Sequence, residues 1–219
     1  MSAIAGATNV TWRHPEWWAL ALSAGAWGWM LASGGHHAHA YGDALQGWMV
    51  MSVAMMLPMV VEPIHLTAER SFWHRRHRAI AGFLTGYLGL WLLAGIAVSF
   101  LRIPHGAQNR AAAIAFAIAG VWQLTRWKQR GLNGCHRSMP LAPRGWRADR
   151  DCARFGALIG TRCLVSCWAL MLVCFASGHA LAATAIVTGV GVGERYMGKP
   201  DRRVLGGVLF VAAGCYALL

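Results

Sequence analysis

Charged residues are scarce in this chain, and the catalytic motifs of several enzyme classes are missing. Of 219 residues, 13% are charged and only eight are Asp or Glu, whereas about 25% of a typical soluble domain is charged. The sequence contains no CxxC or CxxCH, no HExxH and no glycine-rich phosphate loop. Hydrolytic and glycosidic chemistry therefore has no support, and we identify no catalytic residue.

Apolar residues make up 57% of the chain, with 12 Trp and 26 Gly. A helix that crosses a bilayer needs about 20 mostly apolar residues, and several segments approach that length. We predict an all-α, polytopic transmembrane helix bundle that forms one domain over residues 1–219, with about seven spans, or six because some segments are short. The predicted spans are 17–34, 44–63, 79–101, 110–126, 155–177, 180–194 and 204–219.

The net charge of +12 is concentrated in alternate connections between these segments. Seventeen of the 20 Lys and Arg residues fall on one predicted side. Eight of these lie from Arg126 to Arg154, where we predict a basic cytoplasmic loop over 127–154. The positive-inside rule then predicts a protein of the bacterial inner membrane with a cytoplasmic N-terminus and an external C-terminus. This topology accounts for the charge without nucleic acid, although an acidic partner or anionic lipid is an alternative role for the loops.

Five methionines lie between Met49 and Met59, inside the second apolar segment. Met51, Met55 and Met59 recur at four-residue steps, so a helix presents them as one stripe. Thioethers are soft donors that suit Cu(I), but methionine also fills irregular gaps in cores. The stripe therefore predicts either a copper site or packing. Pro58 removes a backbone donor, so we expect a kink there that frees the carbonyl of Ala54.

A second sulfur-bearing face lies in the fifth apolar segment. Cys163, Cys167, Met171 and Cys174 fall within about 80° of one another on a helix and cover about 16 Å of its length. Small, apolar cysteines also suit tight helix packing, so this face too has two explanations. If copper binds between the two helices, the two sulfur faces must point at each other. Arg162 is expected either to extend its charge towards water or to favour the Cys163 thiolate.

Other candidate ligands lie outside these two segments. Three histidines in four residues of the first external connection could collect Cu(II), Zn(II) or Ni(II). A cysteine in the basic loop is a further soft donor. The full set of candidate metal ligands is Met51, Met55, Met56, Met59, Cys135, Cys163, Cys167, Met171 and Cys174, with His36, His37 and His39 as the outer cluster.

Three ordered motifs carry a resemblance. The first comprises Trp48, Met51, Ala54, Met55, Met56 and Pro58; the second comprises Gln123, Leu124, Thr125, Lys128 and Cys135; the third comprises Cys163, Cys167, Trp168, Leu170 and Met171. With Glu194, these residues resemble a bacterial family of predicted metal-binding integral membrane proteins that are labelled copper chaperones. The resemblance implies a membrane fold and a copper role. Gly131 and Ser166 replace two cysteines of the family pattern, which implies fewer ligands here.

Three functions are consistent with these features. The leading hypothesis is an integral membrane protein that binds Cu(I) on Met and Cys ligands between the second and fifth spans and delivers it to a copper enzyme. The alternative is a non-catalytic accessory subunit of a larger membrane complex, in which the sulfur atoms only pack. A third is a membrane thiol redox protein that uses Cys163 and Cys167.

Overall fold

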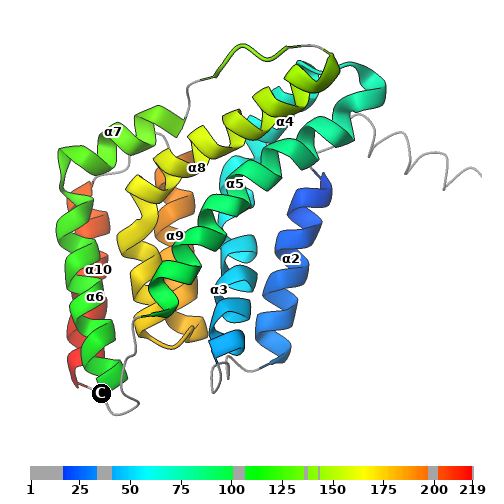
Figure 1. Ribbon diagram of the computed structural model, residues 1–219. Helices are drawn as coiled ribbons and strands as arrows, with labels where there is room; N and C mark the ends of the chain where they lie inside the picture. The colour runs from blue at the N-terminus through cyan, green and yellow to red at the C-terminus, as the bar shows by residue number, and fades with distance from the viewer. Residues whose placement is uncertain are drawn as a thin grey trace, which may run out of the picture.

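The computed structural model describes residues 17–33, 41–100, 107–135, 138–142, 144–196 and 202–218. Over these ranges the chain forms nine α-helices and two short 3₁₀ helices without any strand, which confirms the all-α class (Figure 1). The α-helices are α2 (Trp17–Ala32), α3 (Tyr41–Met56), α4 (Val61–Glu69), α5 (Arg76–Ser99), α6 (Gln108–Gln123), α7 (Arg126–Cys135), α8 (Gly145–Ala176), α9 (Leu181–Tyr196) and α10 (Arg202–Leu218). The 3₁₀ helices are η1 (Pro58–Val60) and η2 (Trp73–Arg75).

The structure does not support seven membrane spans. Within the described ranges, two helical stretches are long and apolar enough to cross a membrane, Trp73–Ser99 and Gly145–Ala176, and the bent pair Leu45–Met56 and Pro58–Glu69 makes a third if it counts as one span. Helices α2, α6 and α9 have 16 residues each. At about 1.5 Å per residue they reach about 24 Å, which is less than a hydrocarbon core of about 30 Å.

Helices α5 and α8 cross in direct backbone contact. A Cβ atom on Gly86 would overlap the carbonyl group of Ala153, and one on Gly156 would overlap that of Phe83. Glycine at both positions lets the two backbones approach, as small residues do at tight helix interfaces. The Phe83 and Phe155 rings pack beside the crossing with centroids 5.4 Å apart. This crossing fixes the position of α8, which runs diagonally through the bundle (Figure 1).

The chain bends at Pro58, as the sequence predicts. Helix α3 ends at Met56, and the helical segments on either side of the break are inclined by 45°. Proline at position 58 cannot donate to the carbonyl of Ala54. That carbonyl instead accepts a hydrogen bond of 2.6 Å from Ser23 Oγ on α2. The side chain of one helix therefore satisfies the backbone group that the kink frees on another.

The segment 127–154, predicted as a basic loop, is largely helical. It contains most of α7, and α8 begins at Gly145, ten residues before the predicted span. The α8 extension is held to α5 by Asp149, whose carboxylate contacts Arg75 at 2.6 Å and Arg78 at 2.8 Å. The sequence did not predict these helices because neither is a continuous apolar run.

Substituting Gly86 tests the importance of the crossing. We expect Gly86→Ala to lower the free energy of unfolding by about 1–3 kcal/mol, because its Cβ would force the two backbones apart. Gly89→Ala, on the same helix, meets nothing within 4 Å and is the matched control. Thermal unfolding of the purified proteins measures both, and equal melting temperatures would show that the close contact does not matter.

Candidate metal centre

Sulfur atoms of α3 and α8 meet inside the bundle. Cys163 Sγ lies 3.8 Å from Met56 Sδ, and Cys174 Sγ lies 3.9 Å from Met55 Sδ. All four side chains are buried. The two sulfur-bearing helices therefore face each other, as a site between them requires. The contact to Cys163 is made by Met56, which lies off the stripe that the four-residue spacing predicts.

The remaining predicted methionines occupy different places. Met51 and Met171 are fully buried in the core, but among the described residues no thiol donates to either thioether. Met59 lies on η1 and packs over Gly191 of α9, with its sulfur 3.6 Å from the position that a Cβ would take. The sulfur atoms of the two predicted faces thus do not form one cluster.

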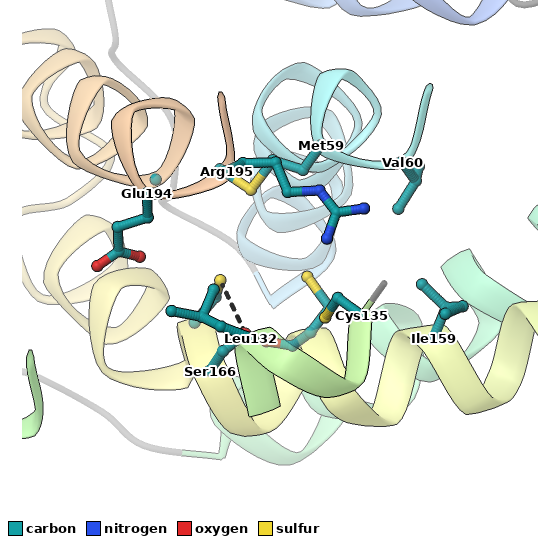
Figure 2. Close-up of a pocket in the computed structure, with 11 residues that line it drawn as sticks. Met59, Val60, Leu132, Cys135, Ile159, Ser166, Glu194 and Arg195 are labelled. Carbon is teal, nitrogen blue, oxygen red and sulfur yellow. Dashed lines mark hydrogen bonds between the residues drawn. The ribbon is translucent and has the colours of Figure 1, made fainter. Parts of the chain in front are cut away.

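A cavity of about 20 Å³ opens beside Cys163 (Figure 2). Its wall combines sulfur-bearing, polar and apolar residues: Met59, Cys135, Cys163 and Cys167; Ser166, Glu194 and Arg195; and Val60, Leu132, Ile159 and Gly191. A space of this size holds about one water molecule. It therefore has room for a single ion among residues from η1, α7, α8 and α9.

Glycines bring α7 against α8 and so carry Cys135 to this cavity. A Cβ on Gly131 would lie 3.2 Å from the Cβ of Ser166, and one on Gly134 would lie 2.7 Å from Cδ of Arg162. Gly131 and Ser166, the two departures from the family pattern, are therefore neighbours in space. Together they leave a site with two fewer thiols than the pattern contains.

Arg162 binds the end of α7. Its Nη1 donates a hydrogen bond of 2.6 Å to the carbonyl of Gly134. A cation suits this place because the last carbonyls of a helix lack backbone partners and carry partial negative charge. Neither role predicted for Arg162 includes this contact, because sequence spacing does not reveal that α7 folds back onto α8.

Hydroxyl groups contact the two central thiols. The Tyr87 hydroxyl donates to Cys163 Sγ over 3.2 Å, and Ser166 Oγ lies 3.5 Å from Cys167 Sγ. Both hydroxyl-bearing residues are buried. Tyr87 was not among the predicted site residues, since a tyrosine in an apolar helix gives no sign of which helix it will face. These contacts orient the two thiols.

A buried ion pair lies next to the cavity. Lys128 Nζ of α7 and Glu194 Oε1 of α9 are 2.8 Å apart, and their side chains are only 2% and 3% exposed. Gln123, the last residue of α6, hydrogen-bonds to both. Gln123, Lys128 and Glu194 all belong to the resemblance described above. They span 72 positions of the sequence and meet in the structure. Glu194 Oε2 is buried and, within the described chain, lacks a hydrogen-bond partner.

Burial controls the protonation of Cys135. Desolvation and, to a smaller extent, the nearby Cys167 raise the pKa of this thiol to about 11, while Arg195 and Arg162 oppose the shift. Burial therefore favours the protonated form of the thiol. Because metals bind thiolates, a metal that uses Cys135 must displace its proton.

Glu62 pairs with Arg195. Its Oε2 lies 3.4 Å from an Nη atom of Arg195, across α4 and α9. Glu62 is 54% exposed whereas Arg195 is 6% exposed, and Arg195 also lines the cavity. The cavity therefore lies beside the Arg195–Glu62 ion pair, whose carboxylate is exposed at the surface.

The predicted histidine cluster of His36, His37 and His39 lies outside the described residues. Within the described ranges, no group of three or more His, Cys, Asp or Glu side chains is arranged to hold a metal ion. Thioether sulfur does lie beside a thiol, in the Met56–Cys163 contact.

The fold and this site define a helical protein with soft sulfur donors buried beside a small cavity. The model of one family, described as PpoB2, copper chaperone, matches residues 45–217. The chain belongs to this family, which confirms the resemblance seen in the sequence and places the protein among those that handle copper. No curated protein and no solved structure matches the chain.

The buried ion pair gives a stability test. We expect Lys128→Met to lower the free energy of unfolding by about 3–5 kcal/mol, because it leaves the Glu194 carboxylate buried without its counter-charge. The double variant Lys128→Met/Glu194→Gln removes both charges and should recover most of the loss. Thermal unfolding measures each variant. If the single and double variants are equally unstable, the pair is not the source of the effect.

Proposed function

We propose that the protein is an integral membrane protein that binds Cu(I) between α3, α7 and α8 and delivers it to a copper enzyme. The observation that carries the proposal is the contact between Met56 of α3 and Cys163 of α8, 3.8 Å between sulfurs, at the edge of a cavity lined by two further cysteines. Cys163, Cys167 and Met56 are the proposed central ligands. Cys135 and Met59 complete the set.

The donor types favour Cu(I). Thiolate and thioether ligands select soft ions, whereas Mg²⁺ and Ca²⁺ require oxygen. With metal–sulfur bonds of about 2.3 Å, two sulfurs of a trigonal site lie about 4.0 Å apart. The observed separation of 3.8 Å needs little adjustment to reach that value. Only small side-chain movements would therefore convert this contact into a binding site.

The surrounding charges bear on an anionic complex. Cu(I) bound by two thiolates carries a net charge of −1, and a buried charge is costly unless a counter-charge is near. Lys128 and Arg195 lie beside the cavity, each paired with a carboxylate, Glu194 and Glu62, and Arg162 adds a third cation near Cys135. These cations would stabilise the thiolate form that copper needs.

The proposed location is the bacterial inner membrane, with the N-terminus in the cytoplasm and the C-terminus outside. Two apolar helical stretches are long enough to cross it. Figure 1 shows α7 and the starts of α5 and α8 at one end of the bundle and the C-terminus at the other. The predicted cytoplasmic arginines of these three helices thus share one end, as the positive-inside rule requires.

Copper content after purification tests the function. We expect the wild-type protein to retain Cu(I). We expect Cys163→Ser/Cys167→Ser/Met56→Leu to lose at least 90% of it. Each tenfold loss in affinity corresponds to about 1.4 kcal/mol of binding free energy. Cys215→Ser is the matched control, because Cys215 is exposed and lies away from the cavity. Equal copper in the folded triple variant and the control would contradict the proposal.

A further inference from the structure

Three exposed tryptophans each carry an arginine guanidinium over the ring. Arg76 lies 4.3 Å from the centroid of Trp73, Arg130 lies 5.1 Å from that of Trp127, and Arg150 lies 5.9 Å from that of Trp146. The three tryptophans are 53%, 62% and 66% exposed. We call these six residues the Arg–Trp rim. Such stacking is favourable but leaves the guanidinium N–H groups able to bind an anion.

The rim follows the ends of the longest apolar helices. Trp73 is the first residue of one candidate span, Trp73–Ser99, and Trp146 is the second residue of the other, Gly145–Ala176. Asp149 holds these two ends together through Arg75 and Arg78. The third pair lies on α7, which begins three residues after the bundle helix α6 ends. All three pairs thus lie where apolar helices of the bundle end (Figure 1).

We propose that the Arg–Trp rim binds the phosphate headgroups of anionic phospholipids. Indole rings favour the boundary between hydrocarbon and water, and the guanidinium group binds phosphate through two parallel hydrogen bonds. This proposal depends on the membrane location proposed above. Lipid fits the rim better than an acidic protein does, because Trp73 and Trp146 lie at the start of the two apolar stretches. In a membrane, that position is the depth of the lipid headgroups.

Lipid retention by the full-length protein tests the rim. Native mass spectrometry of the protein in detergent, titrated with phosphatidylglycerol or with phosphatidylcholine, measures the preference for the anionic headgroup. The test variant is Arg76→Gln/Arg130→Gln/Arg150→Gln. The matched control is Arg110→Gln, an exposed arginine near the start of α6 without a stacked tryptophan among the described contacts.

We expect the wild-type protein to prefer phosphatidylglycerol by about a hundredfold, because each of the three rim arginines contributes about fivefold. Arg110→Gln should change the preference by less than twofold. Arg150→Lys, which keeps the charge, should retain more of the preference than Arg150→Gln. Equal binding of the two lipids by the wild type, or an unchanged preference in the triple variant, would overturn the proposal. Copper content separates the two proposals, since the triple variant should keep it.

Discussion

The structure depends on the close approach of α5 and α8 at Gly86 and Gly156. Without side chains between the two backbones, α8 is fixed against α5. The hydroxyl of Tyr87, the residue after Gly86, then contacts Cys163, about two turns after Gly156 on α8. Elsewhere α8 packs against α6, α7 and α9, and its cysteines contact methionines of α3. The crossing therefore determines which sulfur atoms can come together, although neither glycine contacts the site.

Helix α9 connects the polar interior with the cavity. Its Glu194 forms the buried pair with Lys128, and the next residue, Arg195, lines the cavity and reaches Glu62 at the surface. A buried pair of this kind contributes little net stability, since desolvation offsets most of the attraction, but it strongly disfavours any arrangement that separates the charges. It therefore fixes the relative positions of α6, α7 and α9 around the thiols.

Part of this account could be read from the sequence. Apolar segments located most helices and Pro58 located the bend. Periodicity placed Met55 and Cys174 on sulfur-bearing stripes that do meet, but it left out Met56. The number of spans was wrong because short apolar segments such as 110–126 and 180–194 were counted as spans, whereas α2, α6 and α9 have 16 residues each. The partners of Lys128 and Arg162 could not be predicted, because periodicity gives the face of a helix but not the helix that it meets. The same limit hid the role of Tyr87.

The central claim is that copper is held by sulfur from different helices. X-ray absorption at the copper edge of the Cu(I)-loaded wild-type protein measures it most directly. The account predicts monovalent copper with only sulfur ligands, two or three of them, and a changed first shell when Met56 is replaced by Leu. A first shell dominated by nitrogen or oxygen, or a spectrum unaffected by Met56→Leu, would contradict it.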